Sequence, residues 1–205
     1  MVKIRFTNRE IALLALFSAL WAIIEINLGL VIKMLRVPFS GALLTFLGLM
    51  VIFMGRNIIP KRGTVILMGV TTAFLKMVYL GGIAIYPIIG ILIESVLVEI
   101  GLYKDKPKRY NYGSAGSLAM LWTFFHPFFT QGLLAGWGIL KVYLLIIERG
   151  AKFLGIQEQQ TVLIFLIVLL FHWTLGIIAG LAGWNFSAMI YRRYYTYRVS
   201  EILEQ

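Results

Sequence analysis

The amino-acid sequence predicts an all-α integral membrane protein with six transmembrane helices. Three observations lead to this prediction: 60% of the 205 residues are hydrophobic, only 14% are charged, and the mean hydropathy is +0.87. A soluble domain of this length has too little interior to bury so much apolar surface. The chain contains no cysteine, which excludes disulfides, thiolate metal sites and a cysteine nucleophile.

The first apolar segment follows a basic N-terminal flank and carries no charge from residue 11 to residue 24. With its apolar flanks it is long enough to cross a hydrocarbon core of roughly 30 Å as a helix. Its length and the further spans behind it predict a retained first helix rather than a signal peptide. Small side chains share one face of this helix and favour the close approach of another helix. They are Ala12, Ala15, Ala19 and Ala22.

The following apolar runs are separated by turn and charge signals. Pro38 suits a helix start, Pro60 lies in a basic loop, and the glycine pair at 81–82 marks a turn. We therefore expect residues 1–205 to form a single transmembrane domain. Its helices are predicted at about 10–32, 39–55, 63–80, 83–103, 113–136 and 160–191.

The segment from residue 137 to residue 159 mixes apolar and charged residues. It fits either a seventh span or an amphipathic helix lying on the membrane or over a pocket. Six spans place both termini, the loop around 56–62 and the loop at 104–109 on one side, together with thirteen of the nineteen lysines and arginines. The positive-inside rule then predicts cytoplasmic N- and C-termini in the cell membrane, with an extracytoplasmic lid or interfacial helix between the fifth and sixth spans.

Ionisable residues at membrane depth are costly and are therefore candidates for function. On the six-helix topology the polar residues lie mostly in the outer half, at levels similar to several aromatic residues. Aromatic walls with a few converging polar groups favour a small-ligand pocket that opens to the outside. The candidate ligand-binding residues are Glu25, Lys76, Tyr79, Tyr86, Glu94, Trp122, His126, Gln131, Trp137 and His172.

Each candidate also has a purely structural interpretation. Lys76 can pair with Glu25 or with Glu94 and hold helices together, and each histidine can bond to a neighbouring carbonyl. Aromatic residues near the ends of spans often belong to the interfacial belt. The prediction of a pocket therefore depends on the clustering of these residues rather than on any one of them.

Sequence motifs for catalysis are absent. The two histidines lie on different predicted helices, and the sequence contains neither a G-x-S-x-G elbow nor a phosphate-binding loop. Glu94 and Glu99 are five residues apart and point roughly 140° away from each other on a helix, so they do not form an acidic metal site. The sequence predicts no enzyme, no metal site and no cofactor.

One short motif, together with the architecture, points to a family. The basic N-terminus, the pattern R-E-I-A-x-x-A-x-x-S-A-L from Arg9 to Leu20, the length of 205 residues and the six predicted spans resemble the substrate-specific (S) components of energy-coupling factor (ECF) vitamin transporters. In that family an A-x-x-x-A element of the first helix docks the coupling protein, and Ala15 and Ala19 match it here. The resemblance implies an outward-facing ligand site and a partner complex of one coupling membrane protein and two ATP-binding-cassette ATPases.

The resemblance also bears on the ligand. Metal-type members begin with Met-His, whereas this chain begins MVKIRF, so nickel and cobalt are not expected. An aromatic pocket with acids and histidine suits a flat heterocycle that is cationic or forms hydrogen bonds, and residues 81–101 resemble the middle of thiamine-related members. We expect thiamine or its pyrimidine precursor, while riboflavin, biotin, pyridoxine and queuosine precursors stay open.

Two other classes of function are compatible with the sequence. The chain could act alone as a secondary carrier or channel in which Glu94, Lys76 and the histidines relay protons. It could also be a small membrane enzyme acting on lipids, which the missing catalytic motifs disfavour. Nucleic acid is not an expected partner, because the basic residues form short clusters between apolar runs and serve to orient the protein.

Overall fold

The computed structural model describes residues 5–80, 85–104 and 107–203, and within them the chain forms helices and no strand. The prediction of an all-α protein is confirmed. The helical segments are α1 (Asn8–Ile23), the π-helix η1 (Ile24–Leu28), α2 (Gly29–Met34), α3 (Ser40–Ile58), α4 (Thr64–Leu80), α5 (Ile85–Gly101), α6 (Arg109–Pro127), the π-helix η2 (Phe128–Leu134), α7 (Ile139–Leu154) and α8 (Thr161–Leu203).

The predicted boundaries differ from the observed ones mainly where helices leave the apolar region. The fifth helix begins at Arg109 rather than 113, because the side chain of Asn111 accepts a hydrogen bond of 2.9 Å from the backbone N–H of Lys108 and caps the start. The sixth helix continues to Leu203 rather than ending at 191, since no glycine or proline follows to stop it. The predicted start of the fourth helix, at residue 83, lies outside the described residues.

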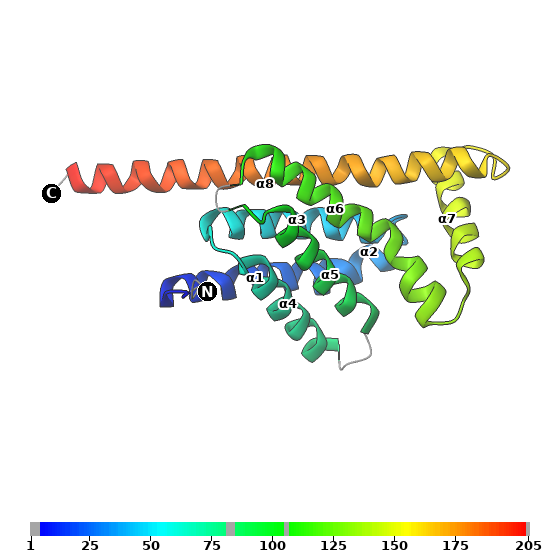
Figure 1. Cartoon of the computed structure of the whole chain (residues 1–205), viewed down its shortest axis with the longest axis horizontal. Helices are drawn as coiled ribbons and strands as arrows, with labels where there is room; N and C mark the ends of the chain where they lie inside the picture. The colour runs from blue at the N-terminus through cyan, green and yellow to red at the C-terminus, as the bar shows by residue number, and fades with distance from the viewer. Residues whose placement is uncertain (1–4, 81–84, 105–106, 204–205) are drawn as a thin grey trace.

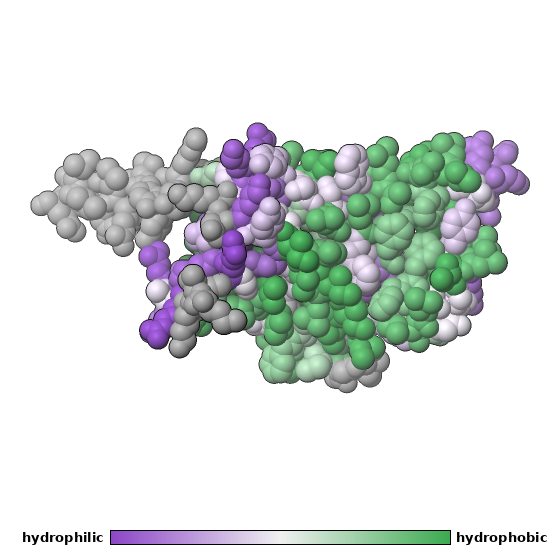
Figure 2. Space-filling view, in the orientation of Figure 1, coloured by the Kyte–Doolittle hydropathy of each residue, from purple (hydrophilic) through white to green (hydrophobic). Residues whose placement is uncertain are grey.

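Three helical segments are long and apolar enough to cross a membrane, namely Asn8–Ile32, Ser40–Ile58 and Thr161–Ile190, and Thr64–Leu80 is apolar but shorter. Apolar side chains also cover the outside of the molecule: Val78 is 66% exposed and Ile178 is 53% exposed. Figure 2 shows apolar residues over the middle of the molecule and polar residues toward its two ends. Exposed apolar surface of this extent is compatible with a membrane protein.

Six helices form a closed bundle in which each one packs against the next in the order α1, α4, α5, α6, α8, α3 and back to α1. Figure 1 shows α3 between α1 and α8. The closest approach joins α6 to α8, because glycines let the two backbones touch: a Cβ atom added to Gly116 would lie 2.2 Å from the carbonyl oxygen of Gly176. Small residues commonly permit such contacts between membrane helices.

Helix α7 accounts for the ambiguous segment 137–159. It has 16 residues, about 24 Å of helix, and runs across the direction of α8 at the end of the bundle opposite the start of α1 (Figure 1). Gly138 and Gly155 bound it with positive φ angles of 84° and 67°, which turn the chain sharply at both ends. One face is buried through Val142 and Ile147, so α7 is an amphipathic helix that crosses the bundle rather than lying alongside the other helices.

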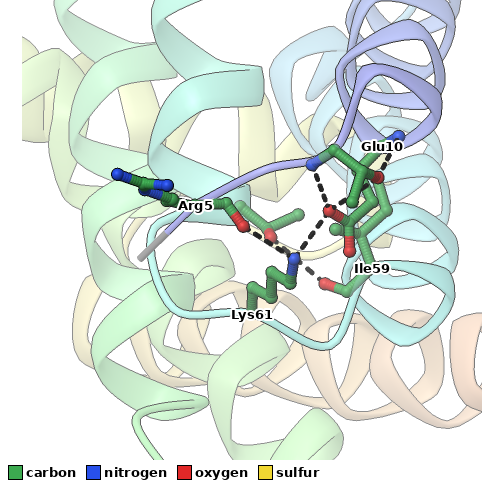
Figure 3. Close-up of polar contacts among 6 residues, drawn as sticks. Arg5, Glu10, Ile59 and Lys61 are labelled. Carbon is green, nitrogen blue, oxygen red and sulfur yellow. Dashed lines mark hydrogen bonds and ion pairs between the residues drawn. The ribbon is translucent and has the colours of Figure 1, made fainter. Parts of the chain in front are cut away.

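The other end of the bundle is tied together by polar contacts. The Nζ atom of Lys61, between α3 and α4, lies 2.6 Å from a carboxylate oxygen of Glu10 and donates to the carbonyl of Arg5 at 2.8 Å (Figure 3). The carboxylate of Glu99, near the end of α5, accepts hydrogen bonds from the backbone N–H groups of Gly63 and Val65 and caps the start of α4. The start of α1, the α3–α4 loop and the end of α5 therefore share one end of the molecule.

Candidate functional site

A cavity of about 920 Å³ lies at the end of the bundle that α7 crosses. Its wall consists of the loop between α2 and α3, the first residues of α3, the later half of α6, one residue of η2, the second half of α7, and His172 of α8. Cavities that hold small organic ligands typically have volumes of about 300–1,000 Å³. The size and the mixed lining of this cavity make it the candidate site.

Aromatic rings form one part of the cavity wall. Phe39, Phe124 and Phe153 line it together with His172. The imidazole of His172 lies edge-on to Phe39 and Phe124, at centroid distances of 5.6 and 5.3 Å, and Phe39 packs edge-on against Phe153 at 5.7 Å. These mutual contacts hold the rings in place and provide a rigid apolar surface for a flat ligand.

The two histidines present defined hydrogen-bonding groups. His172 is 3% exposed, and its Nδ1 atom lies 2.8 Å from the carbonyl oxygen of Val168. The Nε2 atom of His126 lies 3.0 Å from the carbonyl oxygen of Tyr86. A carbonyl oxygen only accepts, so these two nitrogens carry the protons, and the other nitrogen of each neutral ring is an acceptor. Both histidines line the cavity, which suits a ligand with N–H or O–H donors.

The loop between α2 and α3 has an unusual backbone. Arg36 and Phe39 have positive φ angles of 51° and 53°, the only such non-glycine residues in the described part of the chain, and both line the cavity. Residues with side chains adopt this left-handed conformation at a cost of order 1–3 kcal/mol, and they concentrate at ligand sites. Pro38 between them has a fixed φ and restrains the loop further.

Glu94 lies one hydrogen bond away from the cavity. Its carboxylate is 7% exposed and accepts hydrogen bonds from Thr45 at 2.9 Å and from Thr123 at 3.0 Å. Thr123 lines the cavity, whereas Glu94 does not. Of the ten predicted ligand-binding residues, the structure places His126, Gln131 and His172 on the cavity wall and Glu94 directly behind it.

Glu25 and Lys76 lie apart from the cavity and bind each other. The Nζ atom of Lys76 on α4 is 2.6 Å from Glu25, and both side chains are less than 10% exposed. Glu25 belongs to η1, the π-helical turn that interrupts the first helix. Among the pairings weighed from the sequence, the structure forms Glu25–Lys76, which joins the first helix to α4.

The predicted aromatic residues also lie away from the cavity wall. Tyr79 is 60% exposed, and Trp137 is exposed with the ammonium of Lys141 above its ring at 5.0 Å. Trp122 packs edge-on against His126 at 5.6 Å, and Tyr86 contributes its backbone carbonyl to the same histidine. Trp122 and Tyr86 thus support His126 from behind.

Several residues of the cavity wall were missed in the sequence. Arg36, Arg149 and Lys152 line it, whereas in the sequence they resemble loop charges that orient the protein. Phe39 and Phe153 were treated as ordinary apolar residues. The amphipathic character of residues 139–154 is the sequence signal that could have identified these residues. It indicates an apolar face toward the bundle and a charged face beside it.

The buried pair gives a stability prediction. Lys76→Met leaves the carboxylate of Glu25 buried without its partner, and we expect a loss of about 3–5 kcal/mol of unfolding free energy. The double variant Glu25→Leu/Lys76→Met removes both charges and should recover most of this loss. Lys61→Met breaks the more exposed Glu10–Lys61 pair, whose side chains are 21% and 33% exposed, and should cost only about 0–1 kcal/mol.

Denaturant unfolding of the purified variants in detergent micelles measures these differences. A double variant as unstable as Lys76→Met would contradict the account, because the penalty would then not come from an unpaired buried charge.

No family model, curated protein or solved structure matches this chain. Within the described residues, no group of three or more His, Asp or Glu side chains is arranged to hold a metal ion. The cavity and the exposed surfaces of the helices therefore carry the functional assignment.

Proposed function

We propose that this protein is the substrate-binding membrane subunit of an ECF-type importer, which captures a small water-soluble vitamin or vitamin precursor from outside the cell. The observation that carries the proposal is the cavity of about 920 Å³ at one end of an apolar helical bundle. Its aromatic and polar lining is typical of small-molecule sites. Its position agrees with the outward-facing site that the sequence resemblance implies.

In the proposed topology, six helices span the cell membrane with both termini in the cytoplasm, and α7 lies outside as a lid over the cavity. Three helices have the length and hydropathy of spans. The start of α1 and the α3–α4 loop are joined by the Glu10–Lys61 pair at the end of the bundle away from α7 (Figure 1). The basic loops of the sequence gather at that end, as expected for a cytoplasmic side.

The proposed docking surface for the coupling protein lies on α1. Ala12 and Ala15 are exposed and Ala19 is half-buried, while Phe17 on the opposite face packs into the core. Ala22 is only 3% exposed, so a partner helix would meet mainly the first three alanines. Small residues that point away from their own bundle leave room for such a helix to approach closely.

The proposed partners are a coupling membrane protein and two ATP-binding-cassette ATPases. The chain has no phosphate-binding loop of its own, and accumulation of a solute against a gradient requires energy. For the ligand, thiamine or its pyrimidine precursor stays a candidate because of the aromatic wall.

A self-sufficient, proton-coupled carrier is the second candidate, and one contact favours it. Thr123 lines the cavity and donates to the buried Glu94, so a protonatable group lies next to the ligand site. Uptake into proteoliposomes that contain this chain alone, driven by a pH gradient, would support the carrier. No uptake under these conditions is expected for the importer subunit.

Purification from native membranes tests the importer directly. The tagged protein is extracted in mild detergent, and the proteins that accompany it are identified by mass spectrometry. Two ATP-binding-cassette ATPases and one further membrane protein are expected in stable ratio with the tagged chain. Recovery of the chain alone, with transport retained in proteoliposomes, would contradict the importer and support the carrier.

A further inference from the structure

Four charged side chains line the cavity, and three of them are cationic. Arg36 comes from the loop between α2 and α3, while Arg149 and Lys152 come from α7 on the other side. Among the described residues, Glu148 is the only acidic one in the lining. The described lining therefore carries a net formal charge of +2 while both histidines are neutral.

Ion pairs do not compensate these charges within the described residues. In the described part of the chain, no ion pair joins Glu148 to Arg36, Arg149 or Lys152, whereas Glu25–Lys76 and Glu10–Lys61 both pair at 2.6 Å. Lys61 and Lys76 are thus each paired with a carboxylate, whereas the described lining of the cavity holds three cations and one acid. Low-dielectric walls concentrate the field of such charges and attract anions.

The orientation of the protein in the membrane does not account for these cations. In the proposed topology only five lysines and arginines lie at the outer end: Lys33, Arg36, Lys141, Arg149 and Lys152. The positive-inside rule depletes this side of basic residues, yet three of the five line a single cavity. Such a gathering indicates a ligand with the opposite charge.

The remaining lining describes the rest of the ligand. Guanidinium and ammonium groups only donate hydrogen bonds and match carboxylate or phosphate oxygens. The rings of Phe39 and Phe124 suit a flat body, and the acceptor nitrogens of the histidines suit N–H or O–H groups on it. The anionic group would lie between the α2–α3 loop, which contributes Arg36, and α7, which contributes Arg149 and Lys152.

We propose that the cavity binds a water-soluble anion, namely a flat or cyclic compound with a carboxylate or phosphate group, held by Arg36, Arg149 and Lys152. This inference rests on the proposed function, because it specifies the solute of the same site. It disfavours a purely cationic heterocycle such as thiamine.

The test compares pairs of compounds in which one member carries an anionic group and the other lacks it. The purified full-length chain is placed in phosphatidylcholine nanodiscs, and binding is measured by isothermal titration calorimetry for four pairs: riboflavin 5′-phosphate with riboflavin, pyridoxine 5′-phosphate with pyridoxine, biotin with biotinamide, and nicotinate with nicotinamide. In at least one pair the anion should bind about tenfold or more tightly than its neutral partner. Binding of no anion, or equal or tighter binding of the neutral members or of thiamine, would overturn the proposal.

Variants on α7 test the role of charge, and the matched control replaces an acidic residue in place of the basic ones. Arg149→Gln/Lys152→Gln should weaken binding of the preferred anion by about tenfold or more, whereas Glu148→Gln, which removes a negative charge from the lining, should strengthen it. All three side chains line the cavity but are exposed, so these changes should not disturb folding. Equal weakening by Glu148→Gln would contradict the electrostatic account.

A lipid headgroup could present the same chemistry as a soluble anion. Nanodiscs with phosphatidylglycerol test this source by measuring the lipid that the wild type and the Arg149→Gln/Lys152→Gln variant each retain. Variant-dependent retention of this lipid, together with no binding of soluble anions, would overturn the assignment to a water-soluble ligand. None of these measurements involves the ATPases, so failure of the importer proposal and failure of this inference give different results.

Discussion

Ala15→Trp is expected to abolish uptake in cells while leaving the affinity of the purified protein for its ligand close to normal. Ala15 is exposed near the middle of α1 and is not among the residues that line the cavity. An indole ring there would fill the space that a partner helix needs for close approach. Uptake should fall to background because the binding subunit would lose its source of energy.

Leu20→Trp is the matched control. Leu20 is also exposed on α1, at 40%, but it lies about 140° around the helix from Ala15, so an indole there should meet lipid only. Uptake by the variants and co-purification of the ATPases are measured side by side with ligand binding. Loss of ligand binding in Ala15→Trp, or equal loss of uptake in Leu20→Trp, would argue against a separate docking face.

The second large effect is expected at the contact between α6 and α8. In Gly116→Ala the new Cβ atom would lie 2.2 Å from the carbonyl oxygen of Gly176, well inside the contact distance of about 3.3 Å for carbon and oxygen. The two backbones must separate, and overpacking of this kind costs about 3 kcal/mol or more. Alanine gains only about 0.5–1 kcal/mol over glycine as a helix former, so the variant should be strongly destabilised.

Gly113→Ala, one turn earlier on the same helix, separates the clash from the change in helix propensity. A Cβ atom at Gly113 would lie 3.7 Å from Ile177, an ordinary contact. We therefore expect Gly113→Ala to be neutral or slightly stabilising, and Gly116→Ala to be recovered poorly and to unfold at much lower denaturant concentration. Equal stability of the two variants would contradict the close packing of α6 on α8.

The sequence was a good guide to the helices because long apolar runs leave a strong signal. Apolar runs between proline, glycine and charge signals predicted the positions of six helices, and the Glu25–Lys76 pair was among the pairings considered. Hydropathy is less informative where a helix continues into polar surroundings. It therefore missed the capped start of α6 at Arg109 and the continuation of α8 to Leu203.

The cavity was harder to predict because it depends on how α7 crosses the bundle. Depth in the membrane placed Glu25, Lys76, Tyr79 and Trp137 among the ligand-binding candidates, but two of these residues bind each other and two are exposed. The cations of α7 reach the cavity only because glycines at its ends turn the chain across the bundle. Periodicity indicates which face of a helix is apolar, but not the angle at which that helix packs.

The absence of cysteine from the chain allows the orientation of the cavity in the membrane to be measured by labelling single-cysteine variants. Single-cysteine variants Lys152→Cys, in the cavity wall, and Lys104→Cys, between α5 and α6, are treated in intact cells with a membrane-impermeant maleimide. The proposed topology predicts that Lys152→Cys is labelled in intact cells and that Lys104→Cys is labelled only after permeabilisation. Labelling of Lys104→Cys but not Lys152→Cys in intact cells would contradict an outward-facing ligand site.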